Sequence, residues 1–153
     1  MSARRLDRHR LDARRERIEA ACAVLAGLAC EPATAVLSSP ERVAAMERML
    51  EVGIQAAADV AAHVIAAAAW ATPETAGQAF QELAGHDVIA RDLAERLRRA
   101  VGLRNVLAHD YLDVDPARLF ATLSDDVADL RAFVAATLAW STAQVASLSG
   151  RFP

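Results

Sequence analysis

Ser39-Pro40-Glu41-Arg42-Val43-Ala44-Ala45-Met46 begins the stretch of sequence that decides the fold class. A hydroxyl side chain, a proline and an acid in this order are typical of a helix start, as cap, first-turn residue and partner of the positive dipole end. Apolar residues then recur at helical spacing, at Val43, Met46, Leu50, Ile54, Ala57, Ala61, Val64 and Ala68. The stretch therefore predicts one long amphipathic helix over residues 40–70.

The chain on both sides of this helix also divides into helical segments. Similar apolar periodicity predicts a helix over residues 4–29. A short connection, bracketed by Glu31-Pro32 and Ser38-Ser39-Pro40, joins it to the helix over residues 40–70. Thr72-Pro73-Glu74 predicts the start of a short helix that ends near residue 83, before Gly85. Asp87 is expected to cap a helix from about residue 88, and Asp115-Pro116 to begin a last helix that reaches residue 148.

The composition agrees with a protein made of helices. Aromatic residues make up 5% of the chain, and β-branched runs of strand length are absent, which argues against a sheet. A length of 153 residues suits one domain with one core. We therefore expect a single all-α domain over residues 1–153, an antiparallel bundle of four long helices plus one short helix. The last helix is expected to face inward through Leu119, Leu123, Val127, Leu130, Val134, Leu138 and Val145.

Charge and cysteine content narrow the setting in which the protein acts. The net charge of -3 gives no global electrostatic case for binding nucleic acid. Cys22 and Cys30 are eight residues apart on one predicted helix and too far apart to bridge, which fits a reducing compartment. The charged N-terminus does not resemble a signal peptide, and the apolar run at residues 60–71 is too short to span a membrane. These features predict a soluble cytoplasmic protein.

The first 17 residues are rich in arginine. They hold seven arginines against three acids, Asp7, Asp12 and Glu16, a local excess of four positive charges. Such a helix face is most simply a solvated one with ion pairs along it. The alternative is a weak binding surface for RNA or for a protein partner.

Residues 101–112 concentrate polar side chains in an otherwise apolar helix. Arg104, Asn105, His109 and Tyr111 lie within eight residues. Asn105 and His109 share a helix face, whereas Arg104 and His109 point about 140° apart on an ideal helix. Asp113 and Pro116 predict that the helix frays near Tyr111. A site that uses both Arg104 and His109 therefore needs a helix end, a neighbouring helix or a second subunit.

These residue types suggest a chemistry. Imidazole exchanges protons near neutral pH, and guanidinium binds phosphate and stabilises the charge that develops on it. Asn105 is suited to fixing the ring tautomer or holding a phosphate oxygen. With no set of metal ligands and no expected cofactor, the combination favours attack of a ribose 2′-hydroxyl on the adjacent phosphate.

A second polar strip lies on the predicted helix 40–70. Glu51, Gln55, Asp59 and His63 follow one another at steps of four, so they line one face. Such a strip is most often solvated. Asp59 and His63 are also close enough in sequence to touch, and they are candidates for a wall that faces the motif.

Arg104-Asn105-Val106-Leu107-Ala108-His109-Asp110-Tyr111 resembles the Arg-x-x-x-x-His-x-Tyr signature of HepT-like toxins of the HEPN superfamily. The resemblance extends from about residue 6 to 140. It includes, in the family's order, Arg17-Ile18-Glu19, residues 56–65, Ala79-Phe80, Leu93-Ala94, Val101-Gly102 and Val114-Asp115-Pro116.

The resemblance implies a helical-bundle toxin that cleaves RNA without a metal ion. Arg104 and His109 would carry the reaction, Asn105 would orient, and Asp59 and His63 would support. Two subunits would pair so that their motifs border a shared cleft. The implied antitoxin is a minimal nucleotidyltransferase of the MntA type, which would transfer AMP to Tyr111 and block the site.

Two other functions compete with this one. A non-catalytic HEPN module that binds RNA or nucleotide and pairs with a nucleotidyltransferase would use Arg104 for phosphate and His109 only for orientation. A structural dimerisation bundle would be insensitive to changes in the motif.

Overall fold

The computed structural model describes residues 7–109 and 114–149, and within these residues the chain forms six helices. The helices are α1 (Arg8–Ala29), α2 (Ala33–Leu37), α3 (Pro40–Ala68), α4 (Ala76–Gly85), α5 (Arg91–His109) and α6 (Pro116–Ser149). The expected all-α class, with four long helices, is confirmed. The five-residue α2 was not expected, because one turn of helix is too short to show a period; it buries Val36.

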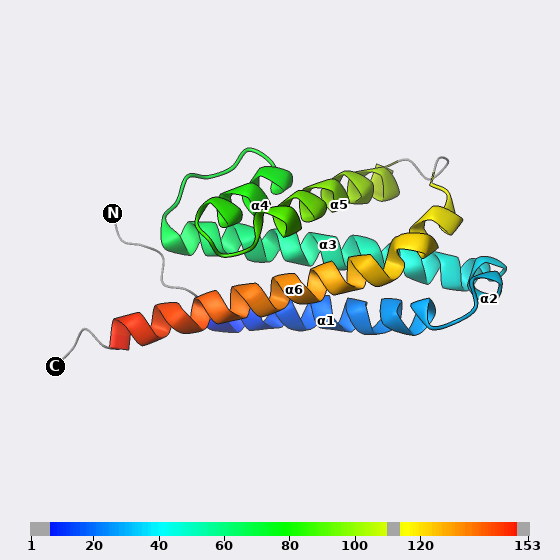
Figure 1. Cartoon of the computed structure of the whole chain (residues 1–153), viewed down its shortest axis with the longest axis horizontal. Coiled ribbons are helices and arrows are strands. Elements are labelled where there is room, and N and C mark those ends of the chain that lie inside the picture. The colour runs from blue at the N-terminus through cyan, green and yellow to red at the C-terminus, as the bar shows by residue number, and fades with distance from the viewer. Residues whose placement is uncertain (1–6, 110–113, 150–153) are drawn as a thin grey trace.

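The long helices α1, α3, α5 and α6 lie side by side along the length of the molecule and alternate in direction (Figure 1). Helix α3 is central, since it packs against all five other helices, while α1 and α6 pack against each other on its other side. The short α2 closes one end of the bundle, and α4 lies beside α5 (Figure 1). The end of α5 that carries the motif therefore lies at the same end as the start of α6 (Figure 1).

Local side chains explain where the helices begin. The Ser39 side chain accepts a hydrogen bond from the Arg42 N–H, and the Asp115 carboxylate accepts one from the Ala117 N–H, so two expected starts are confirmed. The start expected at Thr72-Pro73-Glu74 is wrong. Thr75 caps α4 instead, in a capping box that it completes with Gln78.

The start of α5 also differs from the expectation. Asp87 does not cap a helix, because it has a φ of 57° and belongs to the turn that ends α4. Residues 88–90 then pass through a non-helical link in which Val88 and Ile89 are already buried, and α5 begins at Arg91.

One hydrophobic cluster joins side chains from all six helices, with Phe80, Phe133, Met46 and Leu50 among its fully buried members. Most of the expected inward positions are confirmed. Leu138 is wrong, since it is 48% exposed, and Phe133 takes the buried position that the stripe had missed. Helix α3 is long and apolar enough to cross a membrane by length and composition alone, yet 56% of its most apolar window is buried inside the bundle, as in a core helix.

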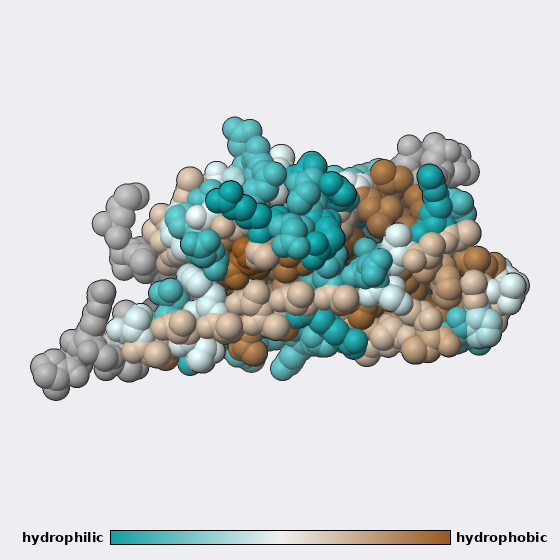
Figure 2. Space-filling view, in the orientation of Figure 1, coloured by the Kyte–Doolittle hydropathy of each residue, from teal (hydrophilic) through white to brown (hydrophobic). Residues whose placement is uncertain are grey.

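The outer surface divides by helix. Hydrophilic side chains gather over α4 and α5, whereas a pale, largely apolar stripe follows α6 (Figure 2). Helix α6 carries exposed alanines, which include Ala128, Ala132 and Ala135.

Asp126 of α6 gives the bundle a predicted pH dependence. Burial raises the pKa of its carboxyl to about 6, against the opposing hydrogen bond from Thr122. Because the unfolded pKa is near 4, this group makes the fold less stable as pH rises through the range from about 4 to about 6. We expect Asp126→Asn to raise the unfolding free energy by about 1–2 kcal/mol at pH 8 and to leave it unchanged at pH 4, as measured by urea unfolding.

Asp125→Asn is the comparison variant, because it removes the same charge from an exposed neighbour whose charge makes only a minor contribution to the raised pKa of Asp126. A stabilisation by Asp126→Asn that is equal at pH 4 and pH 8 would show that ionisation of Asp126 is not its cause.

Candidate functional site

The site is built on the central helix α3 and on the last turns of α5. Arg104 is half-buried and turned toward α3, where its Nη1 donates a hydrogen bond to Gln55 Oε1. Its Nη2 donates to Asn105 Oδ1 at 2.6 Å. Gln55 in turn donates through Nε2 to Asp59 Oδ1 at 2.9 Å. A continuous chain of hydrogen bonds thus links Asn105, Arg104, Gln55 and Asp59.

This chain fixes the position of Arg104 without using all of its donors. A guanidinium has five N–H groups. The Nε–H group is buried and has no hydrogen-bond partner within the described ranges. Gln55 and Asn105 therefore act as a clamp that holds a planar, positively charged fork, and the second N–H group on each Nη atom is the one left for an anion.

His109 lies elsewhere on the same helix. Helix α5 continues through His109, which is its exposed last residue. Among the residues that the structure describes, no side chain forms a hydrogen bond with it. No hydrogen bond joins Arg104 and His109 among the described residues, and helix α5 is unbroken between them, so their spacing of five residues places the two side chains on different faces of the helix.

Asn105 serves Arg104 in this structure, because its side-chain oxygen accepts the Arg104 hydrogen bond. The expectation that it orients His109 stays a prediction. Tyr111 falls outside the described residues, and its roles as substrate contact and modification target also stay predictions.

Asp59 and His63 have different neighbours. Asp59 belongs to the Arg104 chain through Gln55, and its role as a wall of the site stays a prediction. His63 instead contacts α1, with its Nδ1 3.4 Å from Arg14 Nη1, while its Nε2 is buried without a hydrogen-bond partner in the described part of the chain. Burial, followed by the charge of Arg14, lowers the pKa of His63. Because a guanidinium only donates, Nδ1 is the acceptor and the ring is neutral.

Gln55 is a candidate site residue that sequence reasoning did not select. It stood on the polar strip with Asp59 and His63, but a glutamine has no chemistry of its own to draw attention. The available signal was its spacing of four residues from Asp59. On a helix this spacing places the Gln55 amide in contact with the Asp59 carboxylate.

Two hollows in the surface reach the hydrogen-bonded cluster of Asn105, Arg104, Gln55 and Asp59. A groove of about 330 Å³ between α1 and α3 meets it at Gln55, and a wider one of about 530 Å³ between α4 and α5 meets it at Asn105. In the second groove Arg98 is held by both oxygens of Glu95, at 2.9 and 2.7 Å, and Arg99 also contacts Glu95 at 3.3 Å.

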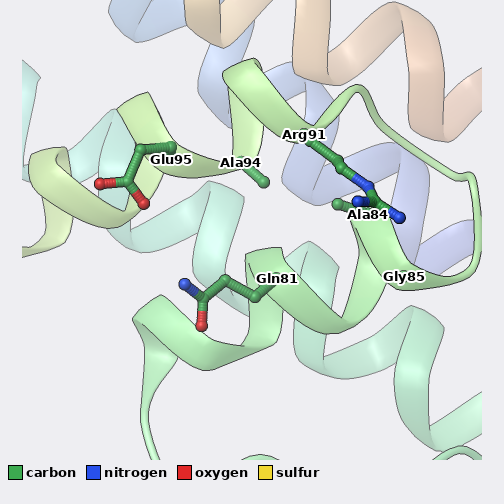
Figure 3. Close-up of a pocket in the computed structure, with 6 residues that line it drawn as sticks. All are labelled: Gln81, Ala84, Gly85, Arg91, Ala94 and Glu95. Atoms are coloured by element: carbon green, nitrogen blue, oxygen red, sulfur yellow. The ribbon is translucent and has the colours of Figure 1, made fainter.

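A third hollow, of about 310 Å³, lies further from the motif (Figure 3). In Figure 3 the Arg91 side chain extends toward Ala84 and Gly85, and Gln81 and Glu95 project from opposite helices. This hollow shares Gln81 and Glu95 with the α4–α5 groove but is not lined by Arg104, Asn105 or His109.

Comparisons with known proteins place the chain in a family. The family model described as "Ribonuclease HepT-like" matches residues 16–137. The tRNA nuclease HepT of Aphanizomenon flos-aquae is 35% identical over 88 residues, 58% of this chain and 60% of that protein. The mRNA nuclease HepT of Shewanella oneidensis is 26% identical over 80 residues, 52% of this chain and 60% of that protein. The matched segments thus span about 60% of the length of these curated relatives.

A solved structure shares the fold. The tri-AMPylated Shewanella oneidensis HEPN toxin, in complex with MNT antitoxin, superposes with a TM-score of 0.78 at 18% identity. The superposition covers 85% of this chain and 97% of that one. Nearly the whole length of the toxin therefore has a counterpart in this bundle.

Proposed function

The chain belongs to the HepT-like family, and from that premise we propose that it is the toxin of a toxin–antitoxin pair, an endoribonuclease that cleaves RNA without a metal ion. The observation that carries the proposal is the clamped Arg104, whose guanidinium is held by Gln55 and Asn105 with N–H groups to spare. The curated relatives are named for different RNAs, tRNA and mRNA. The proposal therefore extends to RNA as a class.

The proposed reaction follows from the chemistry of two side chains. His109 accepts the proton of a ribose 2′-hydroxyl while the 2′-oxygen attacks the adjacent phosphorus. The bond from phosphorus to the 5′-oxygen breaks, and that oxygen takes up a proton from water as it leaves. The products are a 2′,3′-cyclic phosphate and a 5′-hydroxyl. Arg104 stabilises the negative charge that builds on the phosphate oxygens.

The proposed active form is a homodimer. Arg104 is turned toward α3 and His109 is exposed at the end of α5, so the two groups of one chain diverge. A second copy that packs against the motif end of α5 supplies the missing half of a cleft and brings an arginine and a histidine to one phosphate. The symmetric pairing of like surfaces is the common route to such an assembly.

The proposed partner is an MntA-like minimal nucleotidyltransferase that acts in the cytoplasm. The fold is that of a toxin solved in AMPylated form with MNT antitoxin. Transfer of AMP to Tyr111 places a phosphate and a bulky nucleoside two residues from His109. Added negative charge at this point competes with the RNA phosphate for Arg104.

The contact of Arg104 with Gln55 and Asn105, rather than with His109, also suits a second candidate, a non-catalytic module that binds RNA or nucleotide and engages the nucleotidyltransferase. The two candidates differ in one result. The catalytic protein generates new RNA ends, and the binding module does not.

One experiment tests the proposal and its regulation together. Protein purified alone is expected to cleave RNA in the presence of EDTA and to leave 2′,3′-cyclic phosphate ends. Protein co-expressed with the nucleotidyltransferase is expected to gain mass in multiples of one AMP and to lose cleavage. The variant Tyr111→Phe is expected to gain no mass, which intact-mass spectrometry checks. Unmodified protein that binds RNA but never cleaves it would establish the second candidate instead.

A further inference from the structure

We propose that the groove between α1 and α3 is a phosphate-binding subsite, in which Arg14 and Arg17 hold the RNA backbone beside the phosphate at Arg104. The inference rests on the proposed function, because it takes RNA as the substrate. It adds a substrate-positioning surface on the first helix, outside the motif.

The first step is the position of the groove. It is lined by Arg14 and Arg17 of α1 and, among others, by Arg48, Glu51, Gln55 and Asp59 of α3. Gln55 belongs both to the groove and to the clamp on Arg104. The groove therefore begins at the motif arginine. It extends along α3 to Arg48, seven residues or about 10 Å away, so a strand bound at Arg104 continues into it.

The second step is the charge of the groove. Both of its carboxylates are engaged by protein donors, since Glu51 accepts from Arg48 at 3.0 Å and Asp59 accepts from Gln55 at 2.9 Å. Arg14 contacts only the neutral His63, and Arg17 has no ion pair or hydrogen bond through its side chain within the described ranges. Two guanidinium groups without an acid partner thus face a hollow in a protein of net negative charge.

The third step is a comparison with the other groove beside the motif. The arginines near the α4–α5 groove, Arg98 and Arg99, are both paired with Glu95. A phosphate there would have to compete with a carboxylate that already holds both guanidinium groups. Free guanidinium groups favour the α1–α3 groove as the path of the RNA backbone.

Direct RNA binding tests the subsite without depending on cleavage. The full-length His109→Ala protein would be titrated with a fluorescein-labelled single-stranded RNA, with anisotropy read at several NaCl concentrations. Adding Arg14→Gln and Arg17→Gln together is expected to weaken binding about tenfold at low salt and to flatten the plot of log K against log salt by about 0.7 per lost phosphate contact. In the protein that retains His109, the same pair is expected to raise KM with little change in kcat.

Arg131→Gln is the matched control. Arg131 is an exposed arginine of α6 that pairs with Glu19, and Glu19 lies on the opposite side of α1 from Arg17. Arg131→Gln removes one positive charge outside the groove, as Arg17→Gln alone does inside it, and is expected to leave RNA affinity within about twofold. Arg17→Gln alone is a second test variant that is not expected to disturb the fold, because Arg17 is exposed and its side chain has no protein partner in the described residues.

Some results would overturn the subsite. Equal RNA affinity and salt slope for the groove variants and Arg131→Gln would do so. So would a loss of dimer or of nucleotidyltransferase binding with RNA affinity unchanged, since the groove would then be a protein interface. Failure of the parent protein to cleave RNA would overturn the proposed function alone, because the binding titration does not require cleavage.

Discussion

Replacing His109 with alanine is expected to lower the rate of RNA cleavage by about 10³-fold, because general acid–base groups contribute about 10²- to 10⁴-fold. The fold is expected to survive the change. His109 is the exposed last residue of α5 and holds no other described side chain, so the cost in stability is limited to its interaction with the helix dipole, below about 1 kcal/mol.

The measurement is single-turnover cleavage of a labelled RNA in EDTA, with the melting temperature taken on the same preparations. His9→Ala is the matched control, because His9 is an exposed histidine near the start of α1, at the other end of the molecule from the end of α5 (Figure 1). Cleavage by His109→Ala at the parent rate would remove His109 from the reaction. A loss of activity that follows a loss of folded protein would be visible in the melts.

The sequence predicts the helices well where their signals are local. A cap and a first-turn proline are contacts within four residues, which is why the starts at Ser39-Pro40 and Asp115-Pro116 are confirmed. The predicted start of α4 was wrong because Thr72 and Thr75 are both candidate cap residues. Only Thr75 has a glutamine, Gln78, three residues later to complete a capping box. The turn at Asp87 requires a positive φ, which the neighbouring residues do not predict.

The site shows the same division between local and distant information. The spacing of Arg104 and His109 predicts that they diverge, and the unbroken α5 agrees. Gln55 was not selected because its role exists only once α3 and α5 lie side by side, 49 residues apart in sequence. Arg14 and Arg17 belonged to a face described as solvated, and the groove that they line depends on the packing of α1 against α3.

Arg15 is a buried residue that apolar periodicity does not identify, because its side chain is charged. It lies in the arginine-rich segment, yet it is only 6% exposed. Its Nη2 donates to the Thr137 carbonyl at 2.7 Å and to Ser141 Oγ at 3.1 Å, and its Nη1 contacts Asp12 at 3.0 Å. A buried guanidinium thus joins α1 to α6, and burial lowers its pKa from the ordinary arginine value.

Arg15→Ala is expected to lower the free energy of unfolding by about 2–4 kcal/mol, and the melting temperature by roughly 5–15 °C. The change deletes hydrogen bonds to a charged group and leaves a hole between the two helices. Thr137 and Ser141 keep partners of their own, since their hydroxyls donate to the carbonyls of Phe133 and Leu138. The loss therefore comes from the bonds and volume of Arg15 itself rather than from polar groups stranded on α6.

Arg15→Met separates these two contributions, because methionine fills much of the space of the arginine stem and carries no charge. If the hole dominates, Arg15→Met lowers the free energy of unfolding by less than about 1 kcal/mol. If the charged hydrogen bonds dominate, Arg15→Met lowers it by as much as Arg15→Ala does. Arg8→Ala, an exposed arginine of the same helix, is the control and is expected to change stability by at most about 0.5 kcal/mol. Urea unfolding of the four proteins decides the matter, and an Arg15→Ala protein as stable as Arg8→Ala would show that this buried arginine does not hold α1 to α6.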